Sequence, residues 1–539
     1  MTHFPLLTIL VLVPAAVSVV VAFLPRDQVK AIEAVALSGS LVTLGFALAV
    51  AVRFHVGTAG YQLTDHYRWI SDFGISWYFG VDGISLFLVL LTAVLFPIAM
   101  VGTGRARDAK SFAAWMLLLE AACLGSFLSL DVFLFFVFFE LTLVPMYFII
   151  GGWGFERRGS AAVKFFLYTF LGSALMLVGL LTVVFIHQHH TGHLTFNLVQ
   201  LEATPGLTGV TGIALFLAFL AAFAVKAPIF PLHTWSPDAY GQSPTAGVVV
   251  LAGVMAKLGT YGIIRFDFTL FPRATVQMVP VLLTFAVVSI LYGAGVAAAQ
   301  RDLKRLVAYS SLSGMGFITL GLFALTSQGV SGGVLQMLNH GLYTAALFLL
   351  IGMIYERRGT WQLPALRGLQ RPAPLLAGVF TVAMMAAIGL PGLNGFVGEF
   401  LILLGTFLSH RWWAVAGAAG VVAAAIYLLW AFQQAFWHRS DEPNTIVADL
   451  SWGERAIMLP LVAFIVFLGI YPRPILERIT PSVNSVLSRV ERGGSYVVPR
   501  IASASHGGHR VTLNSAGGSP RASVVADQHG HVVAGGQKP

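Results

Sequence analysis

The sequence predicts an all-α polytopic membrane protein with about fourteen transmembrane helices. Of its 539 residues, 57% are hydrophobic and only 10% are charged, and the mean hydropathy is +0.81. Apolar runs of about 18 residues or more recur along most of the chain, and each is long enough to cross the roughly 30 Å of bilayer hydrocarbon. These runs are continuous rather than alternating, which excludes a transmembrane β-barrel.

The remaining composition excludes several other classes of protein. The net charge of +9 comes from short basic clusters between apolar runs, not from a basic stripe that would bind nucleic acid. Cys123 is the only cysteine, so the chain has no internal disulfide and too few thiolates for an iron–sulfur cluster. The glycine-rich segment 293–299 lies inside an apolar run and lacks the βαβ context of a dinucleotide site. We therefore expect this chain to bind no cofactor and no metal.

The apolar runs also predict where the spans lie. They cover approximately 4–24, 31–52, 80–101, 112–130, 132–152, 163–186, 211–235, 244–264, 275–299, 306–325, 332–355, 374–408, 412–437 and 453–472. Arginine and lysine residues concentrate in alternate connecting loops, and the positive-inside rule places those loops in the cytoplasm. Because the number of spans is even, we expect both termini to face the outside.

Two predicted spans contain helix-breaking residues beside a buried charge. In the seventh, Pro228 and Pro231 follow Lys226, and in the twelfth, Pro391 and Gly392 precede the single acidic residue of that span. Proline removes an intrahelical hydrogen bond, and glycine adds backbone freedom. Freed backbone groups are tolerated at membrane depth only where they line protein or water. The two breaks are five spans apart in helices of opposite direction, which predicts inverted repeats around a transport site.

These features divide the chain into five predicted parts. The parts are 1–111 with helices 1–3, 112–264 with a first repeat of helices 4–8, 265–437 with a second, inverted repeat of helices 9–13, 438–472 with the last transmembrane helix, and 473–539 as an external tail. The end of the chain is rich in Gly, Ser, Ala and His and carries too little apolar surface to form a core, so we expect a disordered tail.

Four ionisable residues lie inside stretches that lipid should surround: Glu140, Lys226, Lys257 and Glu399. A charge at the bilayer centre costs roughly 2.5–3.5 kcal/mol on insertion scales, so such residues usually face a protein interior or a water path. Two acids and two bases in one polytopic chain indicate a route for protons or ions.

The types of these residues suggest an order of roles. Burial disfavours the charged form of both an acid and a base, whereas an opposite charge nearby favours it. A pair formed by Glu140 and Lys226 would therefore act as a proton switch if its spacing changes; the alternative is a static ion pair that fixes helix packing. Lys257 has no acid nearby in sequence and fits a relay stage. His340 can relay protons near neutral pH, although a lone histidine on an apolar face is more often a core residue. Glu399 fits a terminal proton donor.

Three further residues are secondary candidates for the proton path. Glu120 lies in an apolar run and either supplements Glu140 or makes a contact at an interface. His233 and Asp238 follow the first broken helix toward the cytoplasm. They form either a path for proton uptake or an ordinary polar cap of a loop.

Six segments together resemble one known family. They are DVFLFFVFFELTLVPMYFIIGGWG, KFFLYTFLGSALML, KAPIFPLHTWSPDAYGQSPTAG, DLKRLVAYSSLSGMGF, LNHGLYTAALFLLIGMIYERRGT and GLPGLNGFVGEFLIL, within roughly residues 75–470. These segments resemble the antiporter-like membrane subunits of NADH-quinone oxidoreductase, respiratory complex I. Glu399 favours the M type (mitochondrial chain 4 type), because the L and N types usually carry lysine there. The absence of a long C-terminal lateral helix also disfavours the L type.

The resemblance implies a proton-translocating subunit that is driven by NADH-to-quinone electron transfer in other subunits. It assigns the proton path to Glu140, Lys226, Lys257, His340 and Glu399. It also implies that FMN, iron–sulfur clusters and quinone are bound by other subunits, that L-type and N-type subunits are neighbours, and that the complex lies in a bacterial plasma membrane. The chain would then be a non-redox part of the enzyme, without a complete active site of its own.

Two positions depart from the family pattern. Gly314 stands where many relatives have histidine, and Tyr240 stands where the usual loop has histidine. A histidine relay at residue 314 is therefore absent or replaced by water, and proton uptake through residue 240 is in doubt.

Three other functions remain open at the level of sequence. One is a subunit of a multisubunit cation/proton antiporter or of a membrane-bound hydrogenase, which share this superfamily. A second is an autonomous transporter of a small solute, which ion transport by the chain alone in liposomes would favour. A third is a scaffold that only holds a membrane assembly together, which normal pumping after neutralisation of all four buried charges would favour.

Overall fold

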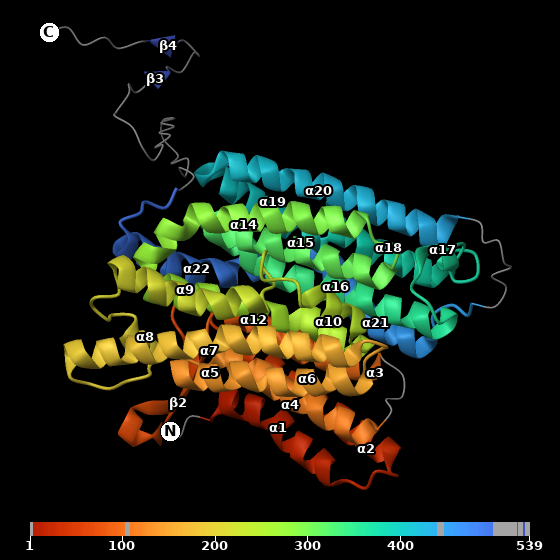
Figure 1. The fold of residues 1–539 in the computed structure, drawn as a ribbon, viewed down its shortest axis with the longest axis horizontal. Coiled ribbons are helices and arrows are strands. Elements are labelled where there is room, and N and C mark those ends of the chain that lie inside the picture. Colours follow the sequence, from red (N-terminus) through yellow and green to blue (C-terminus); the bar gives the residue numbers. More distant parts are fainter. Residues whose placement is uncertain (1–3, 103–107, 439–446, 500–524, 527–531, 534–539) are drawn as a thin grey trace.

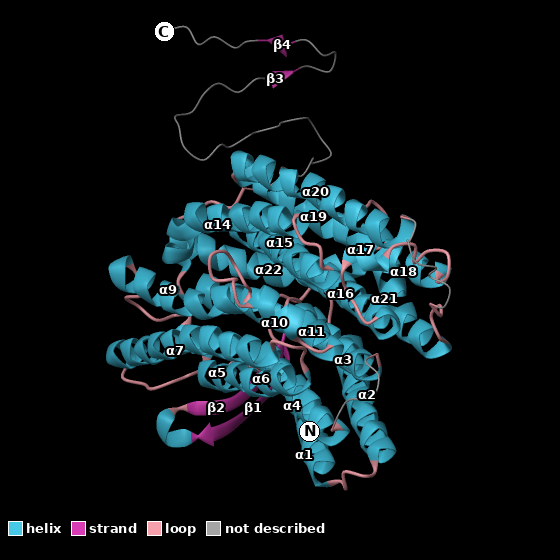
Figure 2. Ribbon diagram, turned by 45° about the vertical axis from the view of Figure 1, so that its right-hand side comes forward, coloured by secondary structure: helices cyan, strands magenta, loops and turns pink. Residues whose placement is uncertain are grey.

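Helices that lie side by side form almost the whole of the computed structural model (Figures 1 and 2). The structure describes residues 4–102, 108–438, 447–499, 525–526 and 532–533. The mainly helical architecture agrees with the prediction from the apolar runs.

The first half of the chain contains thirteen of the described α-helices. They are α1 (Leu6–Phe23), α2 (Val29–Arg53), α3 (Ser85–Val101), α4 (Ala109–Leu128), α5 (Val132–Leu141), α6 (Leu143–Trp153), α7 (Arg158–Thr191), α8 (Leu198–Leu201), α9 (Gly209–Lys226), α10 (Ser236–Gln242), α11 (Thr245–Val250), α12 (Ala256–Gly262) and α13 (Phe268–Leu270). Two π-helical segments join the last three of these helices into one continuous stretch. They are η2 (Leu251–Met255) and η3 (Ile263–Asp267).

The second half contains the other described helices. They are α14 (Pro272–Ala298), α15 (Leu303–Phe323), α16 (Ser327–Arg358), α17 (Leu363–Leu366), α18 (Pro374–Ile388), α19 (Asn394–Ser409), α20 (Arg411–Phe432), α21 (Trp452–Ile470) and α22 (Arg473–Gly494). A further π-helical segment, η4 (Gln433–Trp437), continues α20.

Within the described residues, twelve helical stretches are long and apolar enough to cross a membrane. Three shorter apolar helices, α3, α18 and α19, accompany them. Because α18 and α19 fall within the predicted twelfth span, the twelve long stretches, α3 and this pair correspond to the fourteen predicted spans. The orientation of the spans and the inverted repeats stay predictions.

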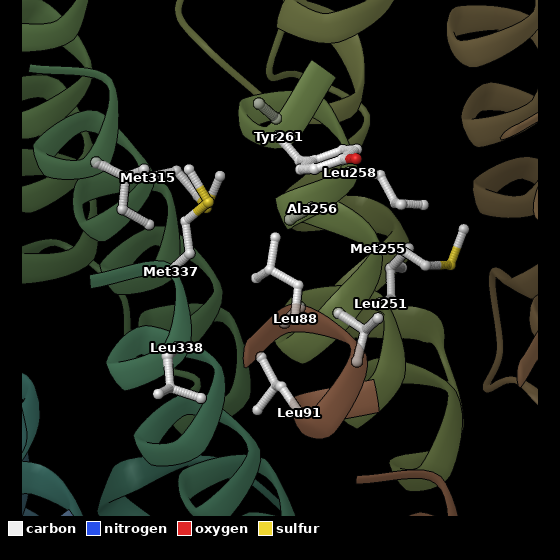
Figure 3. Close-up of a cluster of buried hydrophobic side chains, with 14 of the residues drawn as sticks. Leu88, Leu91, Leu251, Met255, Ala256, Leu258, Tyr261, Met315, Met337 and Leu338 are labelled. Atoms are coloured by element: carbon white, nitrogen blue, oxygen red, sulfur yellow. The ribbon is translucent and has the colours of Figure 1, made fainter. Parts of the chain in front are cut away.

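Helix α16 and the stretch from α11 to α13 form the centre of the bundle. Both are buried along their whole apolar length, whereas less than half of α1, α2, α7, α14, α20 or α21 is buried. A helix that is apolar all round is stable only where other elements cover it. Figure 3 shows this core, in which Leu88 and Leu91 of α3 lie between Leu251 and Met255 on one side and Leu338 of α16 on the other.

The first helix break follows Lys226, the last residue of α9. Pro228 and Pro231 lie in the non-helical segment that leads to α10. Backbone groups freed by the break find partners: the Phe230 N–H donates to Ser289 Oγ at 2.9 Å, and Trp235 Nε1 donates to the Val225 carbonyl at 2.9 Å. The break is thus satisfied within protein, as a break at membrane depth requires.

The second break separates α18 from α19 and contains Pro391. Gly389 and Gly392 have φ values of +81° and +94°, which only glycine adopts without strain. A one-residue interruption was not anticipated: α5 ends at Leu141 and α6 begins at Leu143, although Thr142 keeps a helical backbone and the two form one continuous stretch. Pro145 has no N–H to offer the Leu141 carbonyl, which explains the interruption and was the sequence signal for it.

A β-hairpin is the main departure from an all-helical chain. Strand β1 (Gln62–Ile70) pairs antiparallel with β2 (Ile75–Val81) and lies beside α1 at the edge of the bundle (Figure 2). The segment is rich in aromatic and β-branched residues, and its turn ends at Gly74 with a left-handed φ of +67°. The apolar runs gave no signal for it, because the strands are too short to be read as spans.

The prediction of a disordered tail from residue 473 is wrong for its first part. Helix α22 occupies Arg473–Gly494 and buries Ile479, Val483, Val486 and Val490 on one face. Their spacing is helical, and composition alone hid it. Beyond residue 499 the structure describes only the strands β3 (Val525–Ala526) and β4 (Val532–Val533), which pair antiparallel. The rest of the predicted tail lies outside the described residues.

Helix α22 joins the two halves of the chain. On the first half, Ser482 Oγ accepts a hydrogen bond from the Gly83 N–H at 3.0 Å. On the second half, Ser327 Oγ donates to Asn484 Oδ1 at 2.7 Å, and α22 also packs on α14 and α16. The helix therefore restrains one half of the bundle against the other.

A buried ion pair holds the hairpin side of the core together. Arg265 Nη2 lies 2.8 Å from Asp82 Oδ1, and both side chains are less than 5% exposed. The guanidinium also donates to the hydroxyls of Tyr61 at 2.9 Å and Tyr261 at 3.0 Å. Such a pair contributes little over an apolar replacement of both partners, but removal of one partner leaves an uncompensated charge.

We predict that Arg265→Leu lowers the free energy of unfolding by about 3–5 kcal/mol, because Asp82 is left buried and unpaired. The measurement is thermal unfolding of the purified protein in detergent. Glu477→Gln is the matched control, since it removes the exposed pair with Arg473 and should change stability by less than about 1 kcal/mol. Equal stability of the two variants would contradict a structural role for the buried pair.

Candidate functional site

Helix α16 carries a stripe of polar side chains through the buried core. Gln336, Asn339, His340 and Tyr343 are spaced as i, i+3, i+4 and i+7, which places them on one face of a helix. All four are buried. The sequence predicted a role only for His340; the helical spacing of the other three within an apolar run was the signal that could have revealed them.

Lys257 meets this stripe at His340. Lys257 lies in α12 between the two π-helical segments, and its Nζ is 2.7 Å from His340 Nδ1. Nζ also donates to the carbonyl of Ala252 in η2. π-Helical turns occur frequently at functional sites. The sequence identifies Lys257 and His340 as separate candidates, and the structure places them in direct contact.

The partners of His340 define which ring nitrogen carries the proton. A charged Lys257 has only donors, so Nδ1 accepts from it. Nε2 lies 3.2 Å from the carbonyl oxygen of Ser311 and 3.3 Å from its hydroxyl. A carbonyl only accepts, so Nε2 carries the hydrogen. The neutral tautomer protonated at Nε2 thus fits the contacts with Lys257 and Ser311, and Thr344 Oγ1 lies 3.4 Å from Nδ1 as a longer third contact.

Glu399 lies at the second helix break and is reached through Gln336. Gln336 Nε2 is 3.4 Å from Glu399 Oε1 and 3.5 Å from the hydroxyl of Tyr343. The Tyr343 ring in turn contacts the His340 ring edge-on, with centroids 5.3 Å apart. Because an amide nitrogen carries two hydrogens, Gln336 can hold both groups at once.

The break itself makes room for this carboxylate. A Cβ on Gly389 would lie 2.5 Å from Glu399 Oε2, and a Cβ on Gly398 would collide with Gln336 Oε1. Asn339 Nδ2 donates to the Asn394 carbonyl at 2.7 Å, which fastens the start of α19 to α16. Glycine at the break and an asparagine clamp therefore fix the position of Glu399 beside the polar stripe.

Lys226 and Glu140 are neighbours, but the part of the chain that the structure describes contains no ion pair between them. Lys226 Nζ donates to Thr142 Oγ1 at 2.8 Å and lies 4.6 Å from the centroid of the Phe139 ring. Glu140 interacts with Lys226 electrostatically and is partly exposed at the surface of the chain. Thr142, at the joint of α5 and α6, is a contact that sequence reasoning missed.

Glu120 has a different environment from His233 and Asp238, which both interact with Lys164. Glu120 of α4 is fully buried and accepts a hydrogen bond from Ser40 Oγ at 3.0 Å. Asp238 forms an ion pair with Lys164 at 2.7 Å, and both side chains are partly exposed. His233 is buried, and its ring stacks on Phe230 with centroids 5.5 Å apart. These contacts fit a structural role as well as a proton path.

The structure thus brings the predicted residues together in two groups. Lys257, His340 and Glu399 form one polar group in the centre, linked through Gln336 and Tyr343. Glu140 and Lys226 form a second, at the end of α9. Among the described residues, no hydrogen bond joins Lys226 to Lys257, although α9 and α12 pack directly on each other.

Comparisons with known proteins identify the family. A family model described as NADH:quinone oxidoreductase/Mrp antiporter, transmembrane, matches residues 129–426. NADH-quinone oxidoreductase subunit M of Mycobacterium tuberculosis is 39% identical over 91% of this chain and 95% of that protein. Subunit M of Rhodobacter capsulatus is 41% identical over 89% of this chain and 95% of that protein.

Solved structures show the same fold. A chain of respiratory complex I from Thermus thermophilus, solved with bound NADH, is 33% identical, with a TM-score of 0.81 over 90% of this chain and 99% of that chain. A chain of the Mrp complex from Dietzia is 23% identical, with a TM-score of 0.78 over 91% of this chain and 100% of that chain, and shows likeness of fold alone. The chain belongs to the family of NADH-quinone oxidoreductase subunit M proteins, whose members are similar to NADH-ubiquinone oxidoreductase chain 4 of Marchantia polymorpha, 38% identical to this chain.

Proposed function

We propose that this chain is a proton-translocating membrane subunit of NADH-quinone oxidoreductase. In this proposal, protons move along Glu140, Lys226, Lys257, His340 and Glu399, and NADH-to-quinone electron transfer in other subunits drives them. The observation that carries the proposal is the buried 2.7 Å contact between Lys257 and His340 in a chain of this family.

Across this contact a proton can pass from Lys257 to His340, and the total charge of the two residues stays the same. Its length lies within the reach of about 2.6–3.2 Å that proton transfer requires. When an Nζ–H bond of Lys257 breaks and an Nδ1–H bond of His340 forms, one positive charge stays in the same pocket. The desolvation cost is therefore nearly equal on both sides of the transfer. Because free lysine is the stronger base by roughly four pKa units, a nearby change of charge must supply about 5 kcal/mol to move the proton to His340.

The second half of the route leads from His340 to Glu399. An imidazole protonated at Nδ1 still carries the Nε2 hydrogen beside Ser311, and that proton is the one that leaves. Among the described residues no hydrogen bond joins Nε2 to Glu399, so the route needs a proton carrier between them, and the carboxylate of Glu399 is the final acceptor. Gln336 positions Glu399 and Tyr343 through its two amide hydrogens. Histidine suits this step because it has two ring nitrogens, one to receive and one to release.

The first half of the route begins at the Glu140–Lys226 group. Lys226 is the last residue of α9, so its side chain can change partners without disruption of a helix. Two unit charges about 4 Å apart interact by on the order of 4 kcal/mol at an effective dielectric constant of about 20. Within the residues that the structure describes, Glu140 and Lys226 interact electrostatically without forming an ion pair, so a movement that brought them to this distance would favour the proton on Lys226 by that amount.

The partners follow from the same proposal. Relatives are named as subunits of a multisubunit oxidoreductase, so this chain works beside other membrane subunits, with L-type and N-type neighbours. Flavin, iron–sulfur clusters and quinone belong to those other subunits, and the complex lies in a bacterial plasma membrane. Identity of 36–41% with relatives named NADH-quinone oxidoreductase subunit M, over about 90% of this chain, favours this function over a cation/proton antiporter.

We predict that Glu140→Gln and Lys226→Ala each lower NADH-driven quinone reduction and proton uptake together, by about tenfold or more, in inverted membrane vesicles with intact assembly. The reason is that each change removes one charge of the group that starts the route. Lys30→Ala is the matched control, because this lysine is exposed. Normal rates and normal pumping in the Lys226 variant would sink the scheme and make this group structural.

We also predict that Gln336→Leu lowers proton uptake by about tenfold, because Glu399 and Tyr343 lose the amide that joins them. Gln328→Leu is the control on the same helix, since its carbonyl oxygen has no hydrogen-bond partner among the described residues. The same vesicle assay measures both variants. Equal uptake in the two would show that the polar stripe on α16 does not carry protons.

A further inference from the structure

Gly314 of α15 faces the ring of His340. A Cβ at residue 314 would collide with His340 Cδ2, and it would lie 2.8 Å from His340 Nε2 and 3.5 Å from the Tyr343 hydroxyl. Real Cβ atoms essentially never approach another heavy atom within 3.0 Å. The ring therefore occupies the space that any other side chain at residue 314 would fill.

This contact differs from ordinary close packing of helices. A Cβ on Gly316, two residues farther along α15, would meet the backbone of α14 at Ala286 and Ile290. At Gly293, the nearest atoms are again backbone, from Tyr309 and Ser313. At Gly314, the three nearest atoms all belong to the side chains of His340 and Tyr343. The missing side chain at residue 314 thus makes room for an imidazole, whereas the other two glycines bring helices together.

The ring has little freedom to escape a larger residue. Its Nδ1 is held by Lys257, its Nε2 by Ser311, and its Cα lies in the fully buried α16. A ring pushed away from residue 314 must give up at least one of these contacts. Glycine in a helix costs roughly 0.5–1 kcal/mol relative to alanine, so a specific gain is needed to offset it.

We propose that Gly314 is a positioning residue that holds the His340 ring in place. One edge of the ring then lies against Lys257, and the other lies toward the polar residues that lead to Glu399. One imidazole then touches both parts of the route: Nδ1 receives from Lys257, Nε2 faces Ser311, and the ring contacts the Tyr343 ring edge-on. This inference rests on the proposed function, because Gly314 acts only through His340, which belongs to the proposed proton route.

The first test compares Gly314→Ala with Gly295→Ala in the assembled complex. A Cβ on Gly295 would meet nothing within 4 Å, so this variant adds the same methyl group to a membrane helix without a collision. We expect Gly314→Ala to lower NADH-driven proton uptake in inverted vesicles at least fivefold, and Gly295→Ala to leave it unchanged.

A swap of residues separates positioning of the imidazole from packing. In Gly314→His with His340→Ala, the new ring starts from α15 and enters the space that the His340 ring leaves. We expect this double variant to recover a measurable part of the uptake that His340→Ala alone loses. No recovery, in an assembled complex, would show that an imidazole in this space is not what the route needs.

The outcomes distinguish this inference from the function on which it rests. Normal pumping in His340→Ala overturns the proposed route itself. Loss of pumping in His340→Ala with normal pumping in Gly314→Ala overturns the role of Gly314 and leaves the route standing. If Gly314→Ala does not assemble, Gly314→Ala with His340→Ala should assemble again, because the collision is gone; failure of that double variant would contradict the inference.

Discussion

The cost of placing a charge in an apolar bundle is the constraint on which the rest of this structure depends. Lys257 lies in the centre of the core, and its ammonium has His340 Nδ1 and one backbone carbonyl as partners. The free-energy cost of burying this charge without partners would exceed the few kcal/mol of net stability of a folded protein. The carbonyl partner lies in the π-helical segment η2, and His340 lies on the polar face of α16. The space at Gly314 leaves room for the His340 ring.

The helix breaks answer the same constraint. At each of these places a flexible or polar residue lies next to a charged side chain. Thr142, between α5 and α6, contacts Lys226 at the end of α9, and Gly389 lies against Glu399. The hairpin, the Arg265–Asp82 pair and α22 surround this centre and restrain its helices. A rigid frame around a few movable polar groups is what a coupled proton route requires, because coupling needs a local change that does not unfold the bundle.

Much of the fold could be predicted from the sequence, because twenty apolar residues in a row have few alternatives to a membrane helix. The charged residues could also be named, since they stand out against apolar neighbours. The contact of Lys257 with His340 could not, because 83 residues separate them and only the packed bundle brings them together. Gln336 and Tyr343 were missed although their helical spacing was visible, and α22 was missed because composition masked an amphipathic period.

The most direct measurement is proton uptake per unit of assembled complex in inverted vesicles that carry Lys257→Met, with Lys110→Met as the control. Methionine keeps much of the volume of lysine but can neither hold nor donate a proton. A route through the Lys257–His340 contact predicts that NADH-driven uptake falls by at least tenfold, while the control pumps normally. Normal uptake with Lys257→Met in a fully assembled complex would contradict it, and would mean that protons pass this bundle by other residues.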